Sequence, residues 1–435
     1  MEMNQLVEVK ERLLGFVEQF GPLLGRSERR HWCSMYLSGL LLDGERKSIE
    51  PMAARLPGGN EQSMQQFVNQ SPWDPFSAMD RLVEVMAAKL APSPGVLVLD
   101  DTALPKKGKH SVGVARQYCG ALGKVSNCQS VVSWHFAAQD VHFPLVAELY
   151  LPKEWTTDPS RMAKAGVPKR RTAFVTKWNL ALSLLDRIKG KIPYEAILFD
   201  AGYGEVRQLL SALDKRNELF IARIPESHSF WAHDIKMITA SQSNRGRPRK
   251  HPVVADRTER PLSAKRWTQK LLADGRSFKT VKLPLGYRPS AEVLAVRVRE
   301  VISRAYYRPG PARWLLIERL GEDSFKYYVS NFSEDASVPR MMILAHRRWT
   351  IEQGYQQLKE ELGLDHFEGR SWTGVHHHIA LCFMAFCFLV LLERDHQKKL
   401  SNHAAHDPAV AEHDPYNPDL SALWEDRLPR AVGFL

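Results

Sequence analysis

The stretch VLVLDDTALPKKGK (residues 96–109) decides the fold, because a continuous apolar run leads directly into two acids. Four apolar residues in a row are typical of a strand that is buried on both faces of a sheet. We expect this strand to end at Asp100 and Asp101. A second short apolar run, residues 196–199, also ends in an acid, Asp200. The two runs predict neighbouring strands with a carboxylate at the end of each.

Around these two runs the sequence alternates between strand and helix patterns. The order predicts a mixed sheet with helical crossovers, an α/β fold. Between residues 226 and 340 a basic, Pro- and Gly-marked segment with strand-like runs interrupts that order. We interpret it as a β-rich insertion that splits one α/β domain. The predicted strands are 130–138, 146–151, 219–224, 293–298, 314–318 and 327–329, and the predicted helices are 174–188, one that ends near 215, 341–362 and 375–393.

The first 95 residues predict an all-helical domain. Helices at about 47–56 and 61–70 flank the turn Pro57-Gly58-Gly59-Asn60, which is the outline of a helix-turn-helix. Two packed helices without a DNA-binding role would give the same pattern, so both interpretations stay open. The predicted division is a helical DNA-binding domain at 1–95, a core at 96–225 and 341–400, the insertion at 226–340 and an acidic tail at 401–435.

The length and net charge of the chain limit the number of domains and the class of partner that we expect. The chain has 435 residues, more than one hydrophobic core usually organises, and 60 Lys and Arg against 49 Asp and Glu give a net charge of +11. Such a surplus favours a polyanion as partner. The five cysteines lack CxxC spacing, which is typical of reduced cytosolic thiols. The apolar run 379–392 is shorter than a membrane span, so we expect a cytoplasmic protein without a membrane partner.

Three separated acids form the strongest candidate site: Asp100, Asp200 and Glu352. Carboxylates approach one another closely only when a cation offsets their repulsion. Mg²⁺ or Mn²⁺ takes such ligands together with phosphate oxygens. Two such ions stabilise the entering and leaving oxygens of a phosphoryl displacement. In a basic protein, the three acids predict metal-assisted cutting or joining of nucleic acid.

Glu352 lies in the predicted helix HRRWTIEQGYQQLKEELGL. Arg348, Glu352, Tyr355 and Lys359 follow one another at spacings of four, three and four, which places them on one helical face. Glu352 could then bind metal while Arg348 and Lys359 bind phosphates. A solvated face of alternating charges would give the same spacing, but the two upstream acids favour the site.

At this point the sequence resembles a family. LDDTALPKKGKHSVGVARQYCGALGK (99–124), FDAGYG (199–204), the R-x₃-E-x₆-K run (348–359) and GLLLDGERKSIEPMAARL (39–56) resemble a DDE transposase of a bacterial insertion sequence, insertion-sequence family 701, also described as a DDE superfamily endonuclease. The resemblance implies an RNase H-like catalytic core with a β insertion before the helix that bears the glutamate. It also implies Asp100, Asp200 and Glu352 as the catalytic, metal-binding triad.

Two positions depart from the family or leave its pattern ambiguous. Related transposases have a Tyr three residues before the arginine of the last motif, where this chain has Ala345. The first acid could be Asp100 or Asp101, which point oppositely along a strand. The family pattern sets a Thr or Ser two residues after the acid, as Thr102 stands after Asp100, and so favours Asp100.

Several cations are predicted to contact DNA. Lys106, Lys107, Lys109 and Arg116 follow the first acid and could meet substrate phosphates, or form an ordinary exposed loop. In the insertion, Arg245 and Arg247 belong to RGRPRK, which resembles an AT-hook, an extended segment that enters an A·T-rich minor groove. The run His376 to His378 is interpreted as helix-surface and packing residues, since consecutive helical positions point in different directions.

The predicted function is that of a cut-and-paste transposase. The expected partners are double-stranded DNA, both the terminal inverted repeats of the element and the target, and a second copy of the chain as a homodimer on DNA. The expected cofactors are two Mg²⁺ or Mn²⁺ ions. The alternatives are a transposase-derived DNA-binding protein that does not cleave, and a nuclease on the same core.

Overall fold

The computed structural model describes residues 3–90, 94–238, 251–284, 288–303 and 308–404. The chain forms two compact units, unit 1 from Met1–Tyr194 with Trp349–Leu435 and unit 2 from Glu195–Arg348. These bounds do not coincide with the predicted segment boundaries, and the functions assigned to those segments stay predictions. Residues 401–404 of the predicted acidic tail belong to a helix that ends at Ala404, and residues 405–435 lie outside the described residues.

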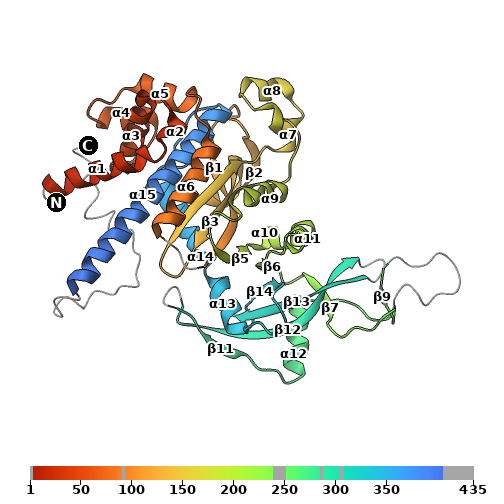
Figure 1. The fold of residues 1–435 in the computed structure, drawn as a ribbon. Helices are drawn as coiled ribbons and strands as arrows, with labels where there is room; N and C mark the ends of the chain where they lie inside the picture. The colour runs from red at the N-terminus through yellow and green to blue at the C-terminus, as the bar shows by residue number, and fades with distance from the viewer. Residues whose placement is uncertain (1–2, 91–93, 239–250, 285–287, 304–307, 405–435) are drawn as a thin grey trace. The chain divides into compact units, whose positions relative to one another are not determined.

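Among the described residues up to Leu90, the regular elements are helices (Figure 1). Helices stand at both positions of the predicted helix-turn-helix. Asn60 begins the second of them because its side chain accepts a hydrogen bond from the Ser63 amide at 2.8 Å. A Cβ atom on Gly59 would lie 2.1 Å from the Ala53 carbonyl oxygen, so only glycine fits this turn. The helices are α1 (Met3–Glu18), α2 (Gly21–Leu24), α3 (Ser27–Leu41), α4 (Ile49–Arg55), α5 (Glu61–Asn69) and α6 (Pro75–Leu90).

Four antiparallel strands of unit 1 are built around β3, which pairs with β1, β2 and β4. The apolar run Val96 to Leu99 in β1 is buried on both faces, as predicted. Helix α9 begins where the Thr176 side chain accepts a hydrogen bond from the Asn179 amide, and it packs on β3 and β4. The bounds are β1 (Gly95–Pro105), β2 (Ala115–Cys119), η1 (Gly120–Leu122), β3 (Lys124–Ala137), β4 (His142–Leu149), α7 (Lys153–Thr156), α8 (Pro159–Lys164), η2 (Lys169–Arg171) and α9 (Lys177–Ile188).

The prediction that β1 ends at Asp100 is wrong. The strand continues to Pro105, and residues 100–105 pair with Cys128 to Ser133 of β3. Ladder hydrogen bonds use only backbone groups, so polar side chains do not end a strand whose neighbour continues beside it. Asp100 and Asp101 therefore lie inside the strand.

Two C-terminal helices complete unit 1, α14 (Trp349–Glu360) and α15 (Trp372–Ala404). Figure 1 shows α15 beside α6, and α15 also contacts α3, α5 and β4. Its segment from Trp372 to Lys398 is long and apolar enough to cross a membrane, but 94% of its most apolar window is buried inside the protein. That burial is typical of a core helix.

The three consecutive histidines of α15 are completely buried, so their interpretation as partly helix-surface residues is wrong. The rings face different partners because successive helical positions differ by about 100°. His376 bonds to the Trp372 carbonyl at 2.8 Å, His377 to the Val68 carbonyl at 2.7 Å, and His378 to the Tyr36 hydroxyl at 2.9 Å. The bonds of His377 and His378 join α15 to the N-terminal helices.

Unit 2 contains a mixed sheet in the order β10-β7-β12-β13-β14-β6-β5, with β11 beside β12. Only the β5–β6 pair in this series is parallel, and β8 and β9 form a separate pair. The strands are β5 (Tyr194–Phe199), β6 (Phe220–Ile224), β7 (Ser229–Ala232), β8 (Met237–Ile238), β9 (Val253–Val254), β10 (Leu262–Ser263), β11 (Lys279–Lys282), β12 (Ser290–Ser303), β13 (Arg308–Arg319) and β14 (Phe325–Ser330). The helices are α10 (Ala201–Gly204), α11 (Arg207–Lys215), α12 (Ala264–Ala273) and α13 (Val338–His346).

The predicted single helix over 341–362 is wrong in one respect. Two helices, α13 and α14, are separated by a turn at Arg347 and Arg348. No Gly or Pro stands between His346 and Thr350, so no local signal marks this turn. Arg348 thus immediately precedes α14, the helix that carries Glu352.

Candidate functional site

Asp100, the first acid of the predicted triad, and its neighbour Asp101 have different environments. The Asp101 carboxylate accepts a hydrogen bond from the Ser130 hydroxyl at 2.8 Å and forms an ion pair with Lys177 at 2.6 Å. Asp100 pairs across the ladder with Ser133 and lowers the tendency of the nearby Tyr355 to ionise. Adjacent strand residues point to opposite faces. This geometry favours Asp100 as the acid on the side of α14.

We expect Asp101→Asn to retain cleavage and to lose less than about 1 kcal/mol of stability, because its ion pair with Lys177 is partly exposed. The asparagine keeps an oxygen for the Ser130 hydroxyl. Chemical denaturation and a strand-cleavage assay measure the two effects. Asp100→Asn is the matched variant, and a silent Asp100→Asn beside an inactive Asp101→Asn would reverse the assignment.

Helix α14 is attached to the sheet by a buried hydrogen bond. The hydroxyls of Tyr355 and Ser133 lie 2.7 Å apart, and both side chains are buried. Burial above all, and then the negative charge of Asp100, raise the pKa of Tyr355 well above its usual value, so the phenol stays protonated. Because Ser133 is the ladder partner of Asp100, this bond fixes α14 next to the strand that carries the first acid.

Glu352 and Lys359 lie beside the buried stripe of α14. That stripe consists of Ile351, Gly354, Tyr355 and Leu358, while Glu352 is exposed. Burial lowers the pKa of Lys359, and the nearby carboxylates of Asp365 and Asp100 partly oppose that shift. The structure thus places Lys359 in the field of Asp100, on the same helix as Glu352.

Removing the buried hydroxyl pair should cost measurable stability. We expect Tyr355→Phe and Ser133→Ala each to lower the free energy of unfolding by about 1 kcal/mol, because each leaves a buried hydroxyl without its partner. The double variant should lose less free energy of unfolding than the sum of the two single losses, since it leaves neither buried hydroxyl without a partner.

Denaturant unfolding of the four proteins of this cycle measures the coupling. Tyr118→Phe is the control, because its ring is 67% exposed. Strictly additive losses would mean that the two hydroxyls do not interact in solution.

Asp200 directly follows β5 in unit 2, as the sequence predicts. Its carboxylate begins α10 by accepting a hydrogen bond from the Tyr203 amide at 3.1 Å. Gly204 must be glycine, because a Cβ atom there would lie 2.0 Å from the Arg223 carbonyl oxygen of β6. The FDAGYG motif therefore holds Asp200 at a strand end through a tight strand-to-helix turn.

The predicted DNA-binding cations differ in their surroundings. Lys107, Lys109 and Arg116 are exposed. The Lys106 ammonium donates to the carbonyls of Asp365 at 3.2 Å and Phe367 at 2.7 Å, and burial lowers its pKa to about 8. Lys106 thus stabilises the fold of unit 1 through these two hydrogen bonds. Arg245 and Arg247 lie outside the described residues.

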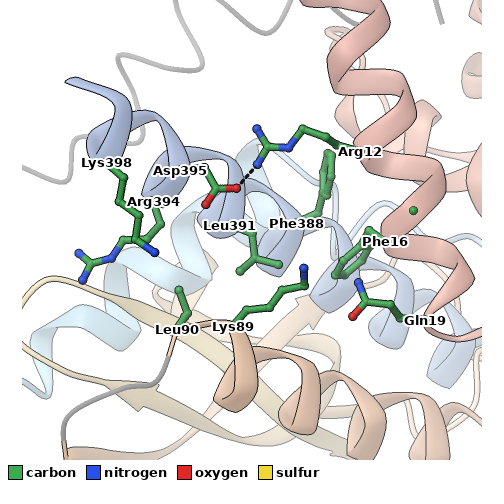
Figure 2. A pocket seen from close by; sticks show the side chains of 11 residues that line it. Arg12, Phe16, Gln19, Lys89, Leu90, Phe388, Leu391, Arg394, Asp395 and Lys398 are labelled. Atoms are coloured by element: carbon green, nitrogen blue, oxygen red, sulfur yellow. Dashed lines mark hydrogen bonds and ion pairs between the residues drawn. The ribbon is translucent and has the colours of Figure 1, made fainter. Parts of the chain in front are cut away.

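A cavity of about 440 Å³ lies elsewhere in unit 1, between α1, the end of α6 and α15. Figure 2 shows apolar side chains such as Phe16 and Leu391 in it, and an ion pair between Arg12 and Asp395. None of the predicted site residues lines it. Its rim also contains Lys89, Arg394 and Lys398.

The donor atoms of the three acids are chemically suited to a hard divalent cation. Each supplies carboxylate oxygens, which Mg²⁺ and Mn²⁺ prefer over nitrogen or sulfur. Asp100 and Glu352 belong to unit 1 and Asp200 to unit 2. Among the described residues, no three His, Cys, Asp or Glu side chains are grouped closely enough to hold a metal ion. Metal binding by the triad therefore stays a proposal.

Comparison with known proteins gives the family. Over 192 residues the chain is 30% identical to a protein from Microchaete diplosiphon named "Probable transposase for insertion sequence element IS701". The alignment covers 44% of this chain and 47% of that relative, so the chain spans about half the length of the curated relative it matches. Residues 19–290, more than half of the chain, match the DDE superfamily endonucleases. The protein therefore belongs to the DDE superfamily endonuclease family.

Proposed function

We propose that this protein is a cut-and-paste DDE transposase that binds the ends of its mobile element, cleaves there and transfers the strands to target DNA. The family match supports a nuclease that acts on DNA. The observation that carries the proposal is the hydrogen bond that attaches α14, which bears Glu352, to Ser133 of β3, the ladder partner of Asp100 in β1.

Asp100, Asp200 and Glu352 would hold two Mg²⁺ or Mn²⁺ ions, which when bound activate a water and stabilise charge at the phosphorus. Attack of that water breaks the bond between phosphorus and the 3′ oxygen and leaves a 3′-hydroxyl on the element strand. In strand transfer, the same hydroxyl would attack a target phosphate, form a new phosphodiester and displace the 3′ oxygen of the target strand, which leaves as a 3′-hydroxyl. Lys359 and Arg348 would bind phosphates beside the reacting one.

The finer architecture belongs to the same proposal. An RNase H-like core would comprise residues 96–225 and 341–400, and the β-rich segment 226–340 would be its insertion. The helix pair α4 and α5 would recognise the element end. Arg245 and Arg247 would add affinity for A·T-rich DNA.

Transposition joins two element ends, so a homodimer on DNA is the expected active assembly. The partners are double-stranded terminal repeats and target DNA. The location would be the bacterial cytoplasm, at the nucleoid. A net charge of +11 favours such a polyanionic partner.

The test uses the purified full chain and a labelled duplex that carries a candidate element end. With Mg²⁺ we expect nicking at the end and, with added target DNA, joined products. With Ca²⁺ in its place we expect binding without cleavage. Binding without cleavage in Mg²⁺ would indicate a DNA-binding descendant of a transposase, and cleavage without any joined product would indicate a nuclease.

A further inference from the structure

An apolar patch is exposed at the tip of the hairpin formed by β2, η1 and β3. Tyr118 is 67% exposed, Val125 54% and Leu122 45%. Large apolar side chains grouped in this way on the surface indicate an interaction site more strongly than single ones do. The tip lies in the sheet of unit 1 that contains Asp100.

The hairpin presents this patch on one face. Tyr118 and Val125 are direct ladder partners, so their side chains lie side by side, and Arg116 stands two residues from Tyr118 on the same face. The opposite face is anchored, because Cys119 and Cys128 are buried there. The backbone thus holds the exposed face in a fixed orientation.

Charge identifies the partner. From Thr102 to Gln139 the chain contains no Asp or Glu. The exposed cations of this stretch are Lys107, Lys109, Arg116 and Lys124. A second copy of the same hairpin would bring like charges together, whereas a nucleic acid offers phosphates for the cations and base faces for the apolar tip.

The length of β3 between Val125 and Ser133 gives the distance from the tip of the hairpin to the ladder partner of Asp100. Val125 lies eight residues before Ser133, the ladder partner of Asp100. At about 3.3 Å per residue the strand spans about 26 Å between them. For a duplex whose axis follows β3, that length corresponds to about eight base pairs of B-form DNA at 3.4 Å each.

We infer that the tip formed by Tyr118, Leu122 and Val125 inserts against the bases of the DNA about eight base pairs from the cleaved bond, while Arg116 on the same face binds a flanking phosphate. The inference rests on the proposed function, because the DNA is the substrate bound near Asp100. Apolar wedges of this kind partly unstack a base step and let the duplex bend towards the protein.

The test uses the full chain in Ca²⁺ and an element-end duplex that carries 2-aminopurine, whose fluorescence rises on unstacking, at successive positions. Wild-type protein should raise the signal most near the eighth base pair from the cleavage site. Tyr118→Ala should abolish that rise and weaken binding about tenfold, whereas Tyr118→Phe should preserve both because it keeps the ring. Arg116→Ala should lower the salt dependence of binding by about one counterion.

Leu14→Ala on α1 and Lys153→Ala on α7 are matched controls, an exposed apolar residue and an exposed cation in unit 1. The inference is wrong if Tyr118→Ala behaves like Leu14→Ala, or if its effect is instead a loss of self-association without DNA. Wild-type protein that binds no DNA would contradict the proposed function itself. If the wild-type protein binds DNA normally and Tyr118→Ala binds it equally well, only the insertion of the hairpin tip is contradicted.

Discussion

Asp200→Asn protein is expected to bind the element end with wild-type affinity and to cleave it about 1,000-fold more slowly. The substitution removes a charged metal ligand from a site that stabilises developing negative charge, which at this size corresponds to about 4 kcal/mol of transition-state free energy. Asparagine is the informative replacement, because Asp200 also accepts a hydrogen bond from the Tyr203 amide at the start of α10. An asparagine side chain makes the same cap, so the fold is preserved.

Glu205→Gln, an exposed acid that follows α10, is the control and should cleave normally. Rates should be compared at saturating protein in Mg²⁺, with affinity measured separately in Ca²⁺. Cleavage by Asp200→Asn at the wild-type rate would remove Asp200 from the metal site. Loss of binding together with cleavage would instead assign Asp200 a structural role.

Glu352→Gln is expected to cause a loss of similar size, again about 1,000-fold in cleavage with DNA binding intact. Glu352 is exposed on the flank of α14, and the buried Tyr355, three residues later, holds this part of the helix against β3. A neutral amide of the same shape keeps the helix in place and removes the charged ligand.

Glu361→Gln is the matched control, because α14 ends at Glu360 and Glu361 stands in the turn that follows it, nine residues after Glu352. It should cleave at the wild-type rate. Lys359→Ala should weaken end binding, with cleavage recovered at saturating protein. An inactive Glu361→Gln beside an active Glu352→Gln would mean that the last motif has been aligned to the wrong glutamate.

The sequence predicted correctly those elements that are determined by residues close together in the chain. The run Val96 to Leu99 is a fully buried strand, and Asp200 ends β5 and begins α10. The turn at Gly59 between α4 and α5 follows from glycine chemistry alone. In each case the residues that determine the structure are neighbours along the chain.

The remaining features depend on contacts between distant residues. The continuation of β1 past Asp100 requires the partner strand β3, which begins at Lys124. The hydrogen bond between Ser133 and Tyr355 joins residues 222 positions apart, and the ion pair between Asp101 and Lys177 joins residues 76 apart. No pattern in either local segment contains that information, so Ser133 and Lys177 could not be singled out from the sequence.

The burial of α15 among the N-terminal helices affects how the protein can be made. Tyr36 of α3 and Val68 near the end of α5 bond to His378 and His377 of α15, more than 300 residues later in the chain. At about 5 to 20 residues per second, a ribosome needs about 15 to 60 s to add that much chain. During this interval the first helices lack the side chains that fill their core. The N-terminal helices of the nascent chain therefore cannot complete their packing until α15 has been synthesised. A truncated product that lacks α15 should be prone to aggregation and degradation.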